Sequence, residues 1–194
     1  DDHDRQHQRG IVVAVGEESQ IAVPDDDVPH VGHRRGQPVY QIEMLALQIV
    51  FSTTVGYRLD MVGDTPPTSI CALFDTDTYP GKRALNKRPL ANVEWALLCD
   101  GVPKDEIYDV LATSEGQDRA LAKLDTIKDD VIWWSAAAET PQLLADGEIV
   151  MGSTYNGRLF AAIAEQNQPI GMLWDAQMLD FDGWIVPAGL PEDR

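Results

Sequence analysis

Basic residues are scarce in this sequence, and that scarcity argues against one class of partner. Fifteen Lys and Arg stand against 32 Asp and Glu among 194 residues, giving a formal net charge of −17. A chain with this balance offers no basic stripe to displace counterions from phosphates, which argues against nucleic acid and disfavours an anionic membrane surface. A small cationic ligand would instead be steered toward such a protein.

Cysteines and long apolar runs are also few. The two cysteines, Cys71 and Cys99, cannot build a disulfide-dense mini-domain or a four-cysteine zinc site. Each lies in an apolar helical pattern, which favours two buried thiols. The longest apolar run, Met44 to Phe51, falls short of the ~20 residues that a membrane span needs. No secretory signal opens the chain at Asp1, so we expect a mature form or an internal piece.

Catalytic motifs are missing. The sequence has no nucleophile elbow, Walker loop, dinucleotide-binding glycine motif or zinc-protease helix motif. All four histidines precede residue 48, so a Ser or Cys nucleophile further along has no imidazole base. The opening Asp1-Asp2-His3 could chelate Cu(II) or Ni(II) if Asp1 carried a free amine, but a polar chain end is the simpler interpretation. We therefore predict a protein that is not an enzyme and has no cofactor or metal.

The chain divides into a poorly specified segment and a well-patterned one. Residues 1–47 contain two short β-type stretches, 11–15 and 21–23, that could pair as a hairpin. In residues 48–187 strand and helix patterns alternate with short links, and residues 188–194 form a tail. This alternation predicts the α/β class, with a mostly parallel sheet and helices on both faces.

The predicted elements follow apolar runs and capping signals. Strands are expected at Ile49–Thr54, Arg83–Leu85, Val131–Trp134, Ile149–Ser153, Ile170–Trp174 and Gly183–Val186. Helices are expected at Ile70–Phe74 and Asn92–Cys99, and at Arg158–Glu165 after a Tyr155-Asn156-Gly157 turn. A capping box of Ser114 and Gln117 opens a further predicted helix, whose apolar stripe is Leu121, Leu124 and Ile127. Another helix is expected to begin at Thr140-Pro141 and to end at Asp146-Gly147.

Polar and aromatic residues gather at three places where strands begin or end, which is where α/β sheets bind ligands. The candidate ligand-binding residues are Ser135, Tyr155, Asn156, Arg158, Asp180 and Asp182. A carboxylate, an aromatic ring and small polar donors are what an ammonium ligand requires. Each residue also has an ordinary structural interpretation, such as a turn, a core aromatic or a solvated carboxylate.

A different class of function also stays open. The three carboxylates Asp175, Asp180 and Asp182 could hold a hard cation or form a glycosidase-like acid pair. The alternative is therefore a metal-assisted hydrolase, which chelation would inactivate.

Several motifs occur together and in order along the chain. They are Tyr79–Leu85 (YPGKRAL), Leu97–Pro103 (LLCDGVP), Leu121–Trp134 (LAKLDTIKDDVIWW), Pro141–Glu148 (PQLLADGE), Ser153–Arg158 (STYNGR) and Phe181–Pro187 (FDGWIVP). In order and spacing they resemble the periplasmic spermidine/putrescine-binding proteins of ABC transporters, from about Ile49 to the C-terminus.

The resemblance implies the second lobe of a type II periplasmic binding protein, in which two α/β lobes are joined by crossing strands and close on a ligand. Residues 49–57 and 183–187 resemble those crossings. Tyr155 resembles the aromatic that stacks on a polyamine, Asp182 the carboxylate that takes an ammonium, and Ser135 a polar contact. The implied protein is a periplasmic monomer that delivers putrescine or spermidine to a membrane permease.

The sequence departs from that family in three respects. Asn86, Lys87 and Arg88 stand where many members have acidic residues, and Arg158 suits a carboxylate better than a diamine. A small amino acid such as 4-aminobutyrate is therefore an alternative ligand. Residues 1–47 do not match the family's first lobe, so we expect a truncated member, and a fragment unable to bind ligand is a third possibility.

Overall fold

The computed structural model describes residues 42–187, with side chains described from residue 48 to residue 184. The predicted β-type stretches at 11–15 and 21–23, the Asp1-Asp2-His3 motif and the tail at 188–194 lie outside the described residues. The described residues belong to one compact unit. None of their helices is long and apolar enough to cross a membrane.

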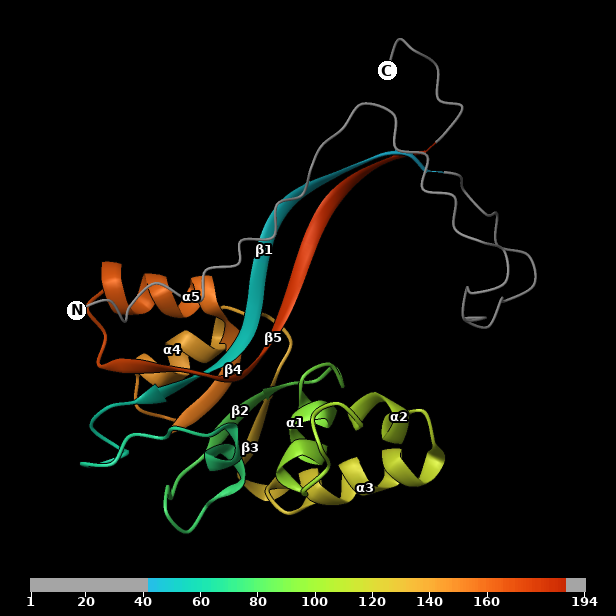
Figure 1. Cartoon of the computed structure of the whole chain (residues 1–194). Helices are drawn as coiled ribbons and strands as arrows, with labels where there is room; N and C mark the ends of the chain where they lie inside the picture. The colour runs from blue at the N-terminus through green and yellow to red at the C-terminus, as the bar shows by residue number, and fades with distance from the viewer. Residues whose placement is uncertain (1–41, 188–194) are drawn as a thin grey trace, which may run out of the picture. The chain divides into compact units, whose positions relative to one another are not determined.

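A five-stranded mixed sheet forms the centre of this unit, in the order β3-β2-β4-β1-β5 (Figure 1). The strands are β1 (Ile42–Arg58), β2 (Arg83–Asn86), β3 (Val131–Trp134), β4 (Met151–Tyr155) and β5 (Ile170–Pro187). Strand β2 pairs in parallel with both β3 and β4, whereas β1 runs antiparallel to β4 and to β5. The α/β class is thus confirmed, and the parallel part of the sheet consists of β3, β2 and β4.

Helices cover both faces of the sheet, as predicted. The α-helices are α1 (Asn92–Cys99), α2 (Ile107–Leu111), α3 (Ser114–Asp125), α4 (Glu139–Ala145) and α5 (Asn156–Phe160). The described residues also form two short 3-10 helices, η1 (Ile70–Phe74) and η2 (Lys128–Asp130), and a π-helix, η3 (Ala161–Glu165), which follows α5 directly. Successive strand residues point to opposite faces. Accordingly Leu85 joins one buried core with Trp95, while Ala84 joins a second core with Leu144 and Leu159.

Several predicted element ends move by a few residues. Helix α3 is capped by Thr113 instead of Ser114, because the Thr113 hydroxyl accepts a hydrogen bond from the Gly116 N–H at 3.0 Å. Of the predicted stripe, Leu124 and Ile127 are buried, whereas Leu121 is exposed. Within the helix the buried positions are Gly116, Ala120 and Leu124, which lie four residues apart on one face.

Three further boundaries differ from the prediction. Helix α4 begins at Glu139, which places Pro141 inside the first turn, and β4 covers residues 151–155. The Asn156-Gly157 pair opens helix α5 instead of forming a turn. Gly157 is not among the residues with positive φ, the backbone conformation that a tight Asn-Gly hairpin turn would need.

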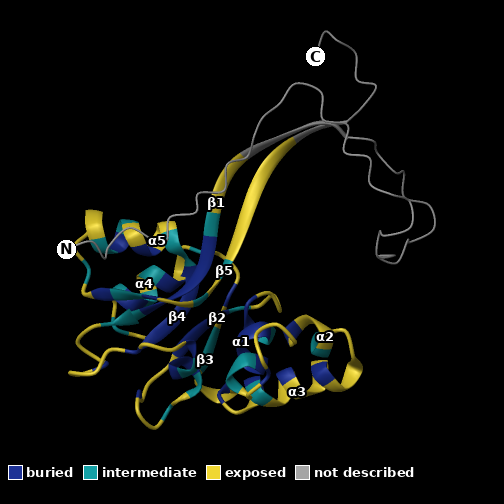
Figure 2. Ribbon diagram, in the orientation of Figure 1, coloured by how far each residue is buried: buried dark blue, intermediate teal, exposed yellow. Residues whose placement is uncertain are grey.

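The two longest strands form a ribbon that extends beyond the sheet. Only residues 53–57 of β1 pair with β4, whereas its pairing with β5 runs from Ile42 opposite Pro187 to Arg58 opposite Ile170. Among the described strands, residues 42–52 therefore pair with β5 alone. The predicted strands 170–174 and 183–186 are two parts of the one strand β5, because residues 178–182 between them also pair with β1. Much of the ribbon beyond the sheet is exposed (Figure 2). Its exposed apolar side chains include Trp184, which is 66 % exposed.

The prediction of two buried thiols is wrong, because Cys71 and Cys99 form a disulfide. Cys71 lies on η1 and Cys99 at the end of α1, and these two elements pack together in one core. Each apolar pattern marked its cysteine as inward-facing. The patterns could not show that the two cysteines, which are 28 residues apart in sequence, lie close enough to bond. A disulfide fits an oxidising compartment.

Candidate functional site

A groove of about 750 Å³ lies beside the ribbon, where strands β1, β4 and β5 meet the start of α5. Strand β1 contributes Ile49, Val50, Phe51 and Thr53, and β5 contributes Asp180 and Asp182. The other walls are Tyr155 of β4, Asn156, Gly157 and Arg158 of α5, Ala161 of η3, and Arg88 and Leu90 from the segment after β2. Five of the six predicted site residues line this groove: Tyr155, Asn156, Arg158, Asp180 and Asp182.

The register of the ribbon sets two carboxylates beside an apolar floor. Asp182 pairs with Ile49, and Asp180 pairs with Phe51. Residues paired directly across two antiparallel strands share a face, and so do residues two apart on one strand. The two carboxylates and the two apolar side chains therefore belong to the same side of the ribbon. Both aspartates are exposed, so each can exchange water for a ligand.

Two aromatic rings meet in the groove. Tyr155 ends β4 opposite Thr53, and its ring contacts that of Phe51 edge to face, with the centroids 5.3 Å apart and the planes at 80°. Such a pair fixes both rings and presents carbon-rich surface to a bound molecule. This surface lies close to the paired carboxylates because Phe51 is the direct partner of Asp180.

The first turn of α5 brings polar groups to the opposite wall. The Asn156 Oδ1 accepts a hydrogen bond from the Ser52 N–H at 3.1 Å, which ties the start of α5 to β1. Arg158 lies two residues further on and is exposed. Within residues 48–184 neither Arg158 nor Arg88 forms a salt bridge. The groove thus holds two carboxylates and two guanidinium groups that can pair with a ligand.

Ser135, the sixth predicted residue, does not line this groove. It follows β3, which β2 separates from β4 and β1 in the sheet. Its N–H donates to Glu139 Oε1 at 3.1 Å, and the Ala136 N–H donates to the same oxygen at 2.7 Å. These two backbone donors hold the pKa of the Glu139 carboxyl below its ordinary value. In this structure the Ser135 backbone helps to anchor the start of α4.

Other groove residues were not among the sequence candidates, namely Ile49, Val50, Phe51, Thr53 and Leu90. The alternation of β1 could have assigned Phe51 to one face, but only the register with β5 reveals that it meets Asp180. The sequence analysis named Arg88 only because it is basic at a place where many members of the resembled family are acidic. Its place in the groove depends on how the segment after β2 passes the end of β4.

The three carboxylates of the hydrolase alternative do not come together. The Asp175 Oδ2 accepts a hydrogen bond from the Ile70 N–H at 2.8 Å, at the start of η1, whereas Asp180 and Asp182 line the groove. Among the described residues no group of three His, Cys, Asp or Glu side chains could hold a metal ion. The proposed cation site of that alternative therefore has no basis in the described part of the chain.

Comparison with known families gives a match over most of the chain. The model of a family described as "Bacterial extracellular solute-binding protein" matches residues 40–194. A curated relative from Pseudomonas aeruginosa PAO1, named gamma-aminobutyric acid-binding protein, is 42 % identical over 125 residues, which cover 64 % of this chain and 35 % of that protein.

Solved structures of bacterial binding proteins are also similar to this chain. The binding protein MotA from A. tumefaciens B6, in complex with glucopine, is 33 % identical with a TM-score of 0.67, over 76 % of this chain and 46 % of that one. The Atu4243-GABA receptor is 38 % identical with a TM-score of 0.63, over 74 % and 43 %. The chain thus spans about a third of the length of the curated relative and under half of these structures.

The resemblance to spermidine/putrescine-binding proteins holds at the level of fold. The substrate-binding protein PotD from Streptococcus pneumoniae superposes with a TM-score of 0.59 over 74 % of this chain, at 16 % identity. At that identity the similarity supports the periplasmic binding protein fold alone. The more similar proteins carry names that refer to 4-aminobutyrate and glucopine.

Proposed function

The chain belongs to the bacterial extracellular solute-binding protein family, and we propose that its groove binds a small amino acid of the 4-aminobutyrate type. The family consists of solute-binding proteins of transporters, which deliver small ligands to a membrane permease. In this proposal Asp182 and Asp180 hold the ammonium group, Arg158 holds the carboxylate, and the rings of Tyr155 and Phe51 contact the methylene chain between them.

One observation carries this proposal: carboxylates and guanidinium groups that form no salt bridge among the described residues share one groove. A molecule with charges of both signs can satisfy both kinds of group at once. Arg and carboxylate meet through two parallel hydrogen bonds, which adds geometric selectivity. The names of the relatives that bind gamma-aminobutyric acid support the same ligand class.

A polyamine is the second candidate. Two adjacent carboxylates in the groove and a net charge of −17 favour a ligand with two or three ammonium groups. The two guanidinium groups oppose it, because a diamine would place its second ammonium near Arg158 without a partner of opposite charge. Putrescine and spermidine therefore belong in every binding experiment as comparison ligands.

The position of the groove supports a role as one half of a two-lobed cleft. It lies beside the ribbon of β1 and β5, in which residues 42–52 of β1 pair with no described strand other than β5. We propose that this ribbon connects to the other lobe, that 49–57 and 183–187 act as the crossings, and that the whole protein works in the periplasm with an ABC permease. Closure of two lobes would then cover a ligand held in the groove.

Asp182→Asn should weaken binding of 4-aminobutyrate by about 1.5 kcal/mol, roughly tenfold, the low end for a hydrogen bond to a charged group. We expect a loss of affinity at the low end of this range because, in the proposed complex, Asp180 still contacts the ammonium group. The measurement is a titration followed by ¹⁵N–¹H NMR, in which the wild-type chain should shift signals near Phe51, Asn156 and Asp182.

The control is Asp118→Asn, which removes one negative charge from the exposed side of α3 and should leave the affinity unchanged. Equal losses in the two variants would mean that only net charge matters. Shifts centred on Ser135, with none in the groove, would place the ligand elsewhere and overturn the proposal.

A further inference from the structure

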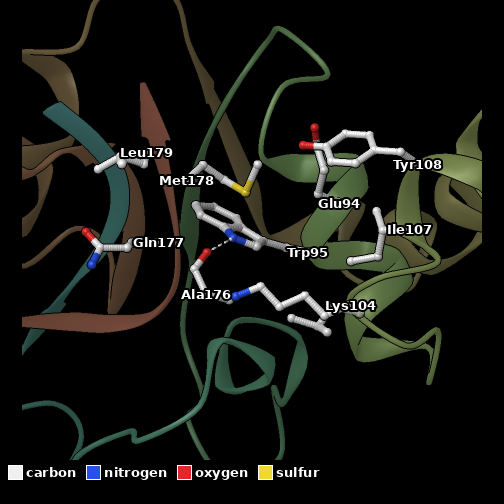
Figure 3. Close-up of a pocket in the computed structure, with 10 residues that line it drawn as sticks. Glu94, Trp95, Lys104, Ile107, Tyr108, Ala176, Gln177, Met178 and Leu179 are labelled. Atoms are coloured by element: carbon white, nitrogen blue, oxygen red, sulfur yellow. Dashed lines mark hydrogen bonds between the residues drawn. The ribbon is translucent and has the colours of Figure 1, made fainter. Parts of the chain in front are cut away.

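A second cavity, separate from the groove, lies between α1, α2 and the middle of β5 (Figure 3). Its volume is about 210 Å³. The walls are mostly apolar and include Trp95, Leu98, Ile107, Met178 and Leu179. The cavity therefore has room for a small organic molecule with an aromatic or aliphatic body.

An irregular stretch of β5 shapes one wall. The pairing of β1 with β5 jumps from Thr53–Met178 to Val55–Leu173, so β5 carries extra residues here. Ala176 in this bulge has a φ of 51°. Its carbonyl accepts a hydrogen bond from the buried Trp95 indole N–H at 2.8 Å, which holds the bulge against α1 (Figure 3).

Glu94 brings a carboxyl group into this apolar cavity. Its residue is only 6 % exposed, and its Oε2 atom is buried without a hydrogen-bond partner among the described residues. Burial raises the pKa of the Glu94 carboxyl above its ordinary value. Lys104 also lines the cavity, but it forms no salt bridge with Glu94 in the described part of the chain. A buried carboxylate oxygen that has no hydrogen-bond partner among the described residues is costly, so a cation that reached it would be held strongly.

Tyr108 completes the site from α2. Its ring lies next to the Glu94 carboxyl in Figure 3, and the residue is 63 % exposed, so it stands at the mouth of the cavity. An aromatic ring can contact a cation through its face while the carboxylate pairs with it. The cavity thus combines one buried carboxyl group, one aromatic ring at the entrance and an apolar interior.

From these features we propose that the cavity is a binding site for an organic ammonium ion with an apolar body. The ammonium group pairs with Glu94 and contacts the ring of Tyr108, while the body packs against Trp95, Ile107 and Met178. This site is independent of the groove, because none of these residues lines the groove.

The test uses benzylammonium as the probe and benzyl alcohol as its uncharged counterpart, each titrated into the full chain. The reporter is the indole N–H signal of Trp95 in ¹⁵N–¹H spectra, assigned with Trp95→Phe. Benzylammonium should shift this signal with a dissociation constant on the order of 1 mM, and benzyl alcohol should bind roughly tenfold more weakly. Glu94→Gln should remove that difference between the probes.

Two further variants test the ring contact and the independence of the cavity from the groove. Tyr108→Ala, at an exposed position, should weaken benzylammonium binding by roughly threefold without unfolding the chain. Asp182→Asn should leave it unchanged, because the groove is not involved. Equal binding of the two probes to the wild type would overturn the proposal, as would an unshifted Trp95 signal. Either result would mean that Glu94 acts only as the acidic residue in the first turn of α1 and binds no ammonium ion.

Discussion

Arg158→Gln is expected to weaken the binding of 4-aminobutyrate by about 2 kcal/mol, roughly 30-fold. The variant loses the guanidinium that we propose as the partner of the ligand's carboxylate. Binding of putrescine should stay the same or become tighter, because the variant removes a positive charge from the groove. Calorimetric titration of both ligands into wild type and variant measures the two effects together.

The matched control for this experiment is Lys82→Gln. Lys82 is exposed and precedes β2, at the opposite end of the parallel strands from the groove, and its loss changes the net charge by the same amount. It should change neither affinity. If Arg158→Gln weakened putrescine and 4-aminobutyrate equally, Arg158 would support the shape of the groove and would not recognise a carboxylate.

Loss of the disulfide should lower the free energy of unfolding by about 3 kcal/mol. In the chain-entropy model, a bridge that closes a loop of this size stabilises the fold by about 3.5 kcal/mol, and measured values for disulfides fall at about 2–4 kcal/mol. Cys71→Ser/Cys99→Ser, compared with wild type by urea denaturation, measures the loss. The bridge joins η1 to α1, so the effect should be global.

Reduction of the wild-type chain provides a second route to the same state. Wild type in reductant should unfold at the same urea concentration as the double variant in either buffer. If the oxidised wild type and the double variant unfolded at equal concentrations, the two cysteines would be free thiols, as the sequence pattern alone had predicted.

The fold was largely predictable from local sequence patterns. Helix 92–99 and strand 131–134 match the structure at both ends. The helix ends just before Gly101, which has a φ of 88°, and the strand coincides with an apolar run. The antiparallel pairing of β1 with β4 and β5 was not predicted, since strand direction depends on which strands become neighbours. The disulfide was missed for the same reason, because two inward-facing helical patterns contain no information about their contact.

The candidate site was partly predictable by the same reasoning. The ends of strands and the starts of helices gather at one edge of an α/β sheet, and five of the six predicted residues do meet in one groove. Ser135 lies apart because β2 stands between its strand and β4. Phe51 was missed because its contact with Tyr155 depends on the register of β1 with β4, and its pairing with Asp180 on the register of β1 with β5. The local sequence pattern predicts which positions are polar, whereas the register of the strands decides which of them line the same groove.

The most direct measurement is a calorimetric comparison of 4-aminobutyrate, putrescine and spermidine with this chain. Carboxylates and guanidinium groups in one groove predict that 4-aminobutyrate binds at least roughly tenfold more tightly than either polyamine, the scale of one charge-assisted hydrogen bond. Putrescine or spermidine binding as tightly as 4-aminobutyrate, or more tightly, would contradict the proposed ligand class.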